Sequence, residues 1–329
     1  MKRPPRLRAG DEVVVVSPSA DSAGSHPRRL RKGIRQLRAM GLNVRMATHA
    51  LDPGPFSSAP VAARVADLHA AFADETVRGV FCAIGGYGAS ELLPALDFDL
   101  IAANPKVFCG YSDITSLHVA MQQRSDLVTF YGPSVLNELG ENGGAFIETL
   151  DALQRATMMS DPLGRLPSFD RIVTERADWI GDALRSGEKA PEVRVVREGR
   201  ATGVLGGGCL PVLCQLLGTP WSPDLKEKVV VLETPQVPYS TARAHSDLWH
   251  LRNAGVLAEA AGIVVGWPAE VSDIPSLAAA VESVTGDLGI PVIVGFPVGH
   301  TSPMATLPMG VRAELDAEGL VLLDSGVRE

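Results

Sequence analysis

Apolar runs alternate with amphipathic stretches along the first 131 residues of the chain. Residues 13–16 are four consecutive valines, a run typical of a strand buried on both faces. Residues 27–40 place apolar side chains on one helical face and arginine or lysine on the other, which predicts an amphipathic helix. The same alternation predicts further strands at 42–47, 79–84, 107–109 and 128–131, and further helices at 60–73, from residue 91 onward and at 113–122.

Strands that alternate with helices indicate an α/β fold, in which helices cover both faces of a parallel sheet. Ligands of such sheets bind beyond the carboxyl ends of the strands. Three loops are expected at that edge, formed by residues 17–20, 85–88 and 110–113. We therefore expect any functional site of this half to lie along these loops.

The alternation weakens between residues 133 and 199 and then resumes. Later strands are predicted at 229–233, 262–266 and 291–295, helices at 241–253 and 275–285, and a closing hairpin at 311–315 and 320–323. We expect an N-terminal α/β domain at 1–150, a connecting and mobile loop segment at 151–200, and a C-terminal domain at 201–329.

The composition excludes several classes of partner. The net charge is −8 and aromatic residues make up 5% of the 329 residues, which argues against the extended phosphate-binding surface and the base-stacking groove of a nucleic-acid-binding protein. The first apolar run is too short for a signal peptide, and no run approaches the roughly 20 residues of a membrane span. We expect a cytoplasmic protein that binds neither nucleic acid nor membrane.

The 4 cysteines lack the spacing of a zinc or redox site and do not suggest a disulfide framework. Cys82 and Cys109 lie in apolar strands and are expected to be buried. Asp97 and Asp99 resemble a metal pair, but further ligands are missing nearby, so they are interpreted as helix-end capping residues. No metal site is predicted.

Three polar residues each follow an apolar strand: Ser112, Glu233 and His300. A serine, a carboxylate and a histidine are the nucleophile, orienting acid and base of acyl-transfer catalysis. Each has a simpler interpretation when taken alone. Ser112 fits a helix N-cap, Glu233 an ion-pair partner, and His300 an incidental loop residue. The coincidence of all three at strand ends favours a catalytic site.

The loop Gly85-Gly-Tyr-Gly88 adds to this pattern because glycines allow backbone N–H groups to approach a ligand closely. It can supply one oxyanion donor, with the N–H of Asp113 as the other. A dinucleotide loop is the competing interpretation, but the third glycine of that motif is missing. The chain order serine, glutamate, histidine also matches α/β-hydrolases, although Ile114 occupies the position of their second elbow glycine.

Several motifs together resemble the LD-carboxypeptidase family of serine peptidases, in the family's order and along nearly the whole chain. They are Ile84-Gly-Gly-Tyr-Gly88, Leu92-Leu-Pro-Ala-Leu-Asp97, Asn104-Pro-Lys106, Gly110-Tyr-Ser-Asp-Ile-Thr115, Tyr131-Gly-Pro133 and Gly295-Phe-Pro-Val-Gly-His300 through Leu307-Pro-Met-Gly310. The resemblance implies an N-terminal parallel-sheet α/β domain, and a C-terminal domain with a small incomplete β-barrel and helices. It also implies a cytoplasmic homodimer with its active site at the domain seam, needing no metal or other cofactor.

The resemblance further implies roles for individual residues. Ser112 is expected to be the nucleophile, Glu233 the triad acid and His300 the base. The backbone N–H groups of Gly86 and Asp113 are expected to form the oxyanion hole.

Two branches of the family differ in substrate. Murein LD-carboxypeptidases remove the terminal D-alanine of tetrapeptide stems, whereas microcin C immunity-type peptidases cut the amide between an aminoacyl or peptidyl carboxyl and a modified nucleotide. Ile84, the run from Asp97 to Asp99 and Trp179 resemble the second branch, in which a loop tryptophan stacks on the nucleobase. Trp179 can equally serve to anchor its loop.

We expect a serine carboxypeptidase-type hydrolase of the microcin immunity type, acting on a small peptide-like or aminoacyl-nucleotide substrate. Gly85, Tyr87 and Trp179 are the expected substrate contacts. A murein tetrapeptide carboxypeptidase is the alternative, and a non-catalytic nucleotide- or peptide-binding protein is the alternative of another class. Two departures from the family pattern bear on the site: Cys209 stands where asparagine is common, and Pro235 and Pro238 make the loop after Glu233 proline-rich.

Overall fold

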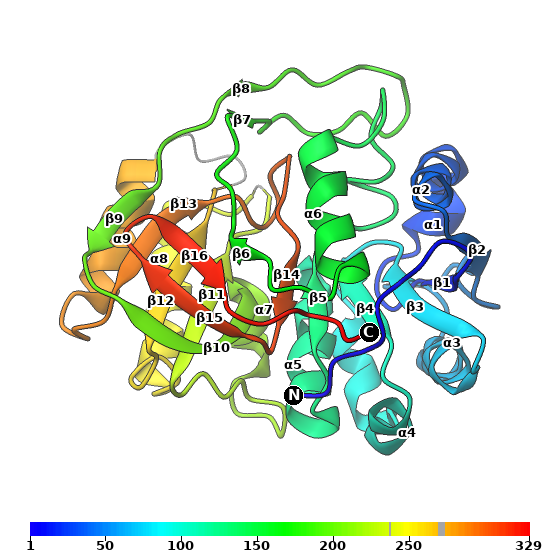
Figure 1. The fold of residues 1–329 in the computed structure, drawn as a ribbon, viewed down its shortest axis with the longest axis horizontal. Helices are drawn as coiled ribbons and strands as arrows, with labels where there is room; N and C mark the ends of the chain where they lie inside the picture. Colours follow the sequence, from blue (N-terminus) through cyan, green and yellow to red (C-terminus); the bar gives the residue numbers. More distant parts are fainter. Residues whose placement is uncertain (237, 269–273) are drawn as a thin grey trace.

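The computed structural model describes residues 1–236, 238–268 and 274–329. Two large β-sheets lie side by side, each with its own helices (Figure 1). This arrangement confirms the predicted α/β class, with a parallel-sheet N-terminal region and a curled, half-barrel sheet built from the C-terminal half. One valine of the proline-rich loop, Val237, lies outside the described residues.

The first sheet has the strand order β14-β5-β4-β3-β1-β2. Its first five strands along the chain pair in parallel, and the sixth joins the edge antiparallel to β5. The strands are β1 (Glu12–Val16), β2 (Asn43–Met46), β3 (Val77–Cys82), β4 (Val107–Gly110), β5 (Thr129–Tyr131) and β14 (Leu307–Met309). The predicted strands of this half are all present. β-branched and aromatic residues fill buried positions of β1, β3, β4 and β5, whereas the edge strand β2 is partly exposed.

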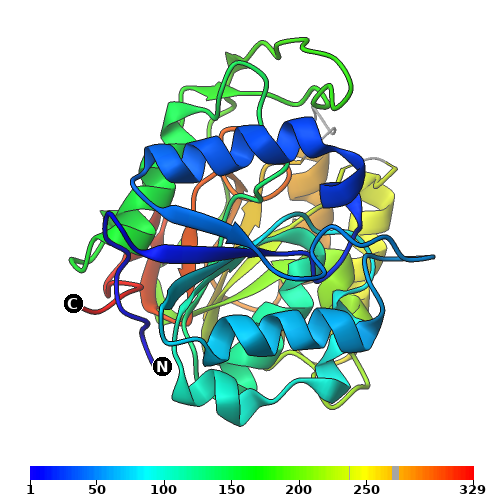
Figure 2. The ribbon, with the colours of Figure 1, turned by 90° about the vertical axis from the view of Figure 1, so that its right-hand side faces the viewer.

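Helices cover both faces of this sheet, with α2 on one face and α3 on the other (Figure 2). The helices of this half are α1 (Ser22–Ser25), α2 (Pro27–Ala39), α3 (Val61–Ala73), α4 (Phe98–Ala103), α5 (Thr115–Ser125) and α6 (Ile147–Met158). Two 3₁₀ turns, η1 (Ala89–Ala95) and η2 (Ser112–Ile114), follow β3 and β4. The helix expected from residue 91 is therefore a 3₁₀ segment, and Pro94 inside it explains the departure from α-helical geometry.

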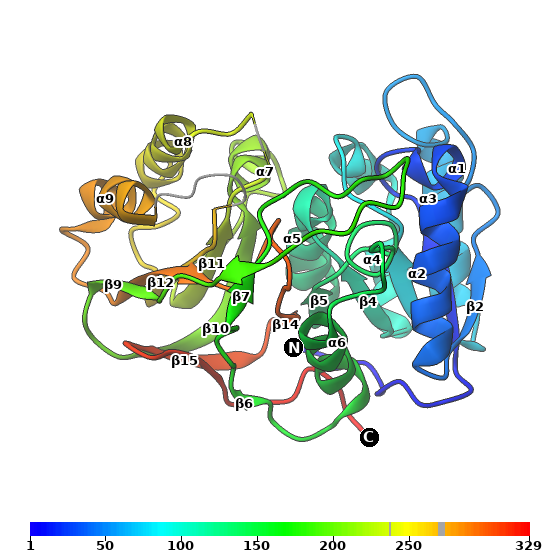
Figure 3. The same cartoon turned by 90° about the horizontal axis from the view of Figure 1, so that it is seen from above.

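The second sheet has the order β6-β16-β15-β10-β11-β12-β13-β9, with four central parallel strands and antiparallel edges. Its strands are β6 (Gly164–Arg165), β9 (Arg194–Arg197), β10 (Ala201–Cys209), β11 (Lys228–Glu233), β12 (Gly262–Gly266), β13 (Val292–Phe296), β15 (Arg312–Asp316) and β16 (Gly319–Leu322). The helices α7 (Leu210–Leu216), α8 (Thr241–Asn253) and α9 (Ile274–Thr285) lie along one side of it (Figure 3). The predicted closing hairpin is β15–β16.

The stretch between α6 and β9 runs over the top of both halves (Figures 1 and 3). Its regular structure is limited to β6 and a short pair, β7 (Arg171–Ile172) with β8 (Glu188–Lys189). The sequence pattern predicted little regular structure after residue 133, so α6 is an addition that it missed. The face that α6 buries carries Thr149 and Thr157 beside Leu153 and Ala156, and this mixture hides the apolar period.

Candidate active site

Ser112 lies immediately beyond β4, at the turn that the sequence predicted. Its backbone φ of 65° falls in the left-handed region, which a non-glycine residue occupies only when its surroundings hold it there. The N-cap residue of the following 3₁₀ turn is Tyr111 and that of α5 is Ile114, so Ser112 caps neither. Instead, Ser112 Oγ lies 2.9 Å from Nε2 of His300. The capping interpretation of Ser112 is therefore wrong.

Glu233 is the last residue of β11 and its side chain is completely buried. Its Oε2 lies 2.7 Å from Nδ1 of His300, and its Oε1 accepts a 2.6 Å hydrogen bond from the hydroxyl of Tyr131. A carboxylate can only accept, so Nδ1 of His300 carries the proton and Nε2 is left as the acceptor that faces Ser112. The three predicted residues thus form one hydrogen-bonded chain.

The backbone next to His300 is shaped to fit against this carboxylate. Gly299 has a φ of 105°, and a Cβ placed on it would lie 2.6 Å from Oε2 of Glu233. Glycine is therefore required there for both conformation and space. The absence of a side chain at residue 299 allows the loop to bring His300 directly over Glu233.

The pair Glu233–His300 is electrostatically coupled. Burial by itself lowers the pKa of His300, but the charge and hydrogen bond of Glu233, together with the charge of Glu138, outweigh it and raise that pKa from 6.5. Burial likewise acts to raise the pKa of Glu233, but the charge of His300 and hydrogen bonds from His300, Tyr131 and Cys209 lower it below 4.5. The glutamate is thus ionised at neutral pH and stabilises an imidazolium.

Asp113 joins the three loops that were predicted to meet at this edge of the sheet. Its buried Oδ2 accepts hydrogen bonds from the hydroxyl of Ser19 at 2.5 Å and from the backbone N–H groups of Gly88 and Ala89 at 2.7 and 2.8 Å. The carboxylate next to the candidate nucleophile therefore holds the glycine loop and the loop after β1 in place.

The glycine loop lies directly against Ser112. A Cβ placed on Gly85 would lie 2.9 Å from Cβ of Ser112, and Gly86 has a φ of 142°. Both glycines line the cleft described below, whereas the side chain of Tyr87 is 88% exposed to solvent. The loop thus brings its backbone, rather than its one large side chain, close to the candidate nucleophile.

A cleft of about 430 Å³ opens above Ser112 and His300. Its walls come from both halves of the chain and from the stretch between α6 and β9, called the crossing segment below. The lining residues are Ala20, Ser22, Ile84, Gly85, Gly86, Tyr111, Ser112, Asn137, Arg176, Ala177, Trp179, Gln236 and His300.

Trp179 of the crossing segment is half-buried. The guanidinium carbon of Arg29 lies 5.1 Å from its ring centre, and the ring of His26 packs edge-on at 4.9 Å. Trp179 is therefore both anchored and part of the cleft wall.

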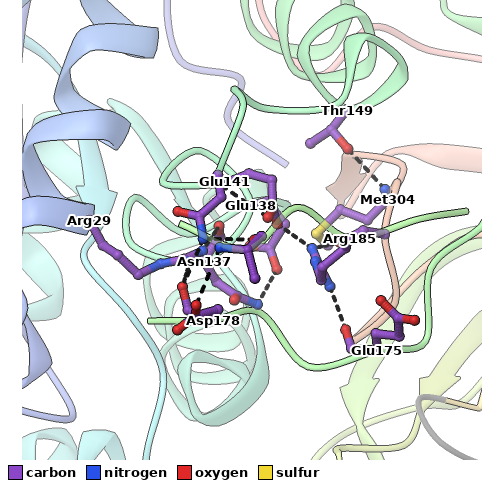
Figure 4. Close-up of polar contacts among 12 residues, drawn as sticks. Arg29, Asn137, Glu138, Glu141, Thr149, Glu175, Asp178, Arg185 and Met304 are labelled. Carbon is purple, nitrogen blue, oxygen red and sulfur yellow. Dashed lines mark hydrogen bonds and ion pairs between the residues drawn. The ribbon is translucent and has the colours of Figure 1, made fainter. Parts of the chain in front are cut away.

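The crossing segment that carries Trp179 is fastened by two arginines (Figure 4). Arg29 of α2 donates to the carbonyl of Asp178 at 3.1 Å. Arg185 donates to the carbonyl of Glu175 at 2.9 Å and forms an ion pair with Glu141. Arg29 lies outside the segment, whereas Arg185 belongs to it and is paired with Glu141 outside it, so both contacts hold the segment against the N-terminal half.

Other predicted features have simple structural roles. Asp97 N-caps α4 by accepting from the N–H of Leu100 at 2.8 Å, which confirms its interpretation as a capping residue. Cys82 and Cys109 are fully buried, as expected. Cys209 is buried beside Glu233, and its N–H donates to Thr115 Oγ1 at 3.0 Å.

Sequence reasoning missed several residues of the site. Tyr131, Asn137 and Arg176 either contact the triad or line the cleft, yet none was proposed as a site residue. Tyr131 offered a signal, because it ends a strand and belongs to one of the quoted family motifs. Asn137 and Arg176 lie in the weakly patterned stretch, where position in the sequence carries little information about neighbours in space.

Within the described parts of the chain, no group of three or more histidine, cysteine or acidic side chains is arranged to hold a metal ion. Among the same residues, no helix is both long enough and apolar enough to cross a membrane.

Comparison with known proteins identifies the family. Residues 13–132 match the LD-carboxypeptidase N-terminal domain, and residues 202–315 match the LD-carboxypeptidase C-terminal domain. Among curated proteins, the chain is 31% identical to the "Probable murein peptide carboxypeptidase" of Bacillus subtilis, covering 99% of this chain and 96% of that protein. It is 25% identical to the "Microcin C7 self-immunity protein MccF" of Escherichia coli, covering 94% and 92%.

Solved structures agree with this result. The MccF-like protein from Bacillus anthracis has 32% sequence identity and a TM-score of 0.91, with 98% of this chain and 100% of that chain covered. The MccF-like protein from Streptococcus pneumoniae, solved in complex with AMP, has 26% identity and a TM-score of 0.85, with 96% and 99% covered. The chain belongs to the LD-carboxypeptidase family of serine peptidases, as its motifs predicted.

Proposed function

We propose that the protein is a serine peptidase of the microcin immunity type, which hydrolyses the amide between an aminoacyl or peptidyl carboxyl and a nucleotide. The observation that carries the proposal is the chain of short contacts from Ser112 Oγ through His300 to Glu233, at 2.9 and 2.7 Å. In this proposal, residues 1–150 carry the nucleophile and residues 201–329 carry the acid and base.

The proposed reaction has two steps. His300 Nε2 takes the proton of Ser112 as Oγ attacks the substrate carbonyl, and the N–H groups of Gly86 and Asp113 stabilise the resulting oxyanion. The amide C–N bond then breaks and His300 gives its proton to the leaving amine. Water, activated in the same way, hydrolyses the acyl-enzyme and regenerates Ser112.

The nucleotide substrate is supported by the walls of the cleft. Trp179 offers an aromatic surface, while Arg176 adds a cation and Asn137 an amide. The MccF-like protein from Streptococcus pneumoniae was solved in complex with AMP, which supports a nucleotide as the kind of ligand. The murein tetrapeptide alternative is supported by the Bacillus subtilis relative, whose name describes a murein peptide carboxypeptidase.

The test is direct. Purified protein is incubated with an aspartyl sulfamoyl adenylate and, separately, with a murein tetrapeptide, and the products are identified by mass spectrometry. Cleavage of the adenylate is expected, whereas cleavage of the tetrapeptide alone would reverse the order of the two proposals. Nucleotide binding without cleavage of either compound would favour a non-catalytic binding protein. Sedimentation of the same sample tests the homodimer that the family resemblance implies.

A matched pair of variants tests the nucleophile. Ser112→Ala is expected to abolish turnover because no hydroxyl remains to attack the substrate. Ser116→Ala, at the second residue of α5, is the control: its hydroxyl is buried and has no hydrogen-bond partner among the described residues. Activity close to that of the parent in Ser112→Ala would show that the triad assignment is wrong.

A further inference from the structure

Tyr131 contacts both ends of the candidate triad. Its hydroxyl donates to Oε1 of Glu233 at 2.6 Å and accepts the backbone N–H of Ser112 at 3.2 Å. The side chain is fully buried, and its strand, β5, belongs to the first sheet, whereas Glu233 ends a strand of the second. A single phenol oxygen therefore connects the two sheets at the point where the proposed acid and nucleophile meet.

We propose that Tyr131 is a positioning residue of the catalytic triad, which fixes Glu233 and the Ser112 turn relative to each other through its hydroxyl. The inference rests on the proposed function, since it requires Ser112, His300 and Glu233 to act as the triad. Tyr131 itself is not expected to touch the reacting atoms.

The Tyr131 hydroxyl completes the hydrogen bonding of the Glu233 carboxylate. Oε2 of Glu233 is occupied by His300 Nδ1, so Oε1 is the oxygen that needs a second donor in a fully buried position. A buried charged acceptor left without its donor loses substantial stabilisation. The Tyr131 hydroxyl supplies that donor, and it also stops the carboxylate from rotating about its bond to Cγ. Both effects keep Oε2 aimed at His300.

The same hydroxyl restrains the turn at Ser112. A φ of 65° at Ser112 is unfavourable for a residue with a Cβ and must be maintained by its surroundings. The hydrogen bond from Ser112 N–H to Tyr131 is one such restraint. Because the same hydroxyl binds Glu233, any shift of the nucleophile turn is resisted by the acid of the other sheet. The phenol thus preserves the 2.9 Å separation of Ser112 Oγ and His300.

Besides His300, Glu233 is hydrogen-bonded by the Tyr131 hydroxyl and by the Cys209 thiol, and a thiol is the weaker donor of the two. The titratable and polar groups that face Tyr131 or His300 are Glu233, Glu138, Cys209, Tyr111 and His118. Tyr111 donates its own hydroxyl to Glu138 at 2.7 Å. Nε2 of His118 is 2.9 Å from the carbonyl of Gly110, and its ring lies 5.6 Å from that of Tyr131. Neither Tyr111 nor His118 makes the contact that Tyr131 makes with Glu233.

The test compares Tyr131→Phe with Tyr239→Phe. Tyr239 is the matched control, because its hydroxyl donates to the buried carboxylate of Asp247 at 2.9 Å and it does not line the cleft. For whichever substrate the parent cleaves, we expect kcat to fall roughly 10- to 100-fold in Tyr131→Phe, with KM changed by less than about threefold. Tyr239→Phe is expected to retain the parent kcat.

The pH profile separates positioning from a general loss of packing. Removing the donor leaves the charge of Glu233 less compensated, so it stabilises the His300 imidazolium more strongly. The acid limb of kcat/KM should therefore move to higher pH in Tyr131→Phe and stay in place in Tyr239→Phe. An unchanged limb, or an equal loss of kcat in the two variants, would overturn the inference.

A second variant covers the case in which Tyr131→Phe does not fold. Replacing Tyr131 by 3-fluorotyrosine keeps the ring and the hydroxyl but makes the hydroxyl a stronger donor. The acid limb of kcat/KM should then move to lower pH, and an unchanged limb would contradict the inference.

The parallel measurement on Ser112→Ala distinguishes a failure of the proposed triad from a failure of the proposed role of Tyr131. Activity there contradicts the triad itself, whereas an inactive Ser112→Ala with a parent-like Tyr131→Phe contradicts only the role of Tyr131.

Discussion

Arg185 and Glu141 form an ion pair in which both side chains are buried, with exposed fractions of 6% and 2%. The same guanidinium donates to Ser302 Oγ at 3.0 Å, two residues beyond His300. The segment that carries Trp179 is therefore joined directly to the loop that carries the proposed base. Substrate binding at Trp179 and the position of His300 are therefore both expected to depend on the contact between Arg185 and Ser302.

Breaking this ion pair is expected to cost much more than breaking an exposed one. Arg185→Met leaves Glu141 buried without its partner, so the free energy of unfolding should fall by about 3–5 kcal/mol, measured by urea denaturation. Arg171→Met is the control, because the Arg171–Glu148 pair is partly exposed and should contribute no more than about 1 kcal/mol. The double variant Arg185→Met with Glu141→Met should recover most of the loss. Equal effects of the two single variants would contradict this account.

The pH dependence of catalysis follows from the coupling of His300 to Glu233. The base must be neutral to accept a proton, so kcat/KM falls as the pH drops through the pKa of His300. Since Glu233 raises that pKa above 6.5, the fall should be centred above pH 6.5. His118, whose pKa is lowered by burial to about 4, should add nothing in this range. The measurement is a pH profile of kcat/KM, and a midpoint at or below pH 6.5 would contradict the coupling of His300 to Glu233.

Gly299 provides a steric test of the acid. Gly299→Ala places a methyl group against the Glu233 carboxylate and should lower kcat by about 100-fold. Gly289→Ala is the control: its φ is also positive, at 71°, but beyond its own chain neighbours no described atom lies within 4 Å of the added carbon. Both variants incur the backbone cost of about 1–2 kcal/mol in stability, and only Gly299→Ala should lose activity. Equal kcat values would show that the contact with Glu233 is unimportant.

Trp179 distinguishes the two proposed substrates. Stacking of a base on an aromatic ring is worth about 1–3 kcal/mol, so Trp179→Ala should raise KM for an aminoacyl sulfamoyl adenylate by about 10- to 100-fold. KM for a murein tetrapeptide should change by less than about threefold, since it offers no base.

Trp249→Ala is the matched control for Trp179. Trp249 also lies near an arginine and a histidine, with Arg252 at 5.5 Å and His245 at 6.4 Å, but it lies on α8 outside the cleft. KM for both substrates should be unchanged in this control. Equal changes for the two substrates in Trp179→Ala would indicate that the tryptophan only anchors its loop.

The sequence was sufficient for the features that depend on neighbours along the chain. The valine run of β1 and the alternating helices predicted the parallel sheet, because burial on two faces leaves a continuous apolar signature. Ser112, Glu233 and His300 could be chosen because each follows such a run, and the family motifs supported the choice. Helix α6 was not predicted, because its buried face is partly polar and shows no clear apolar period.

What the sequence by itself determined is therefore the α/β class, the family and the candidate residues, since these rest on local pattern and motif. Only the tertiary structure decided that residues 67 and 188 positions apart from His300 lie within 2.7 and 2.9 Å of it. It also decided that β14 returns to the first sheet and that Tyr131 links the two sheets. Such contacts arise from the packing of distant segments, and no local preference of a residue encodes which distant atom its side chain will meet.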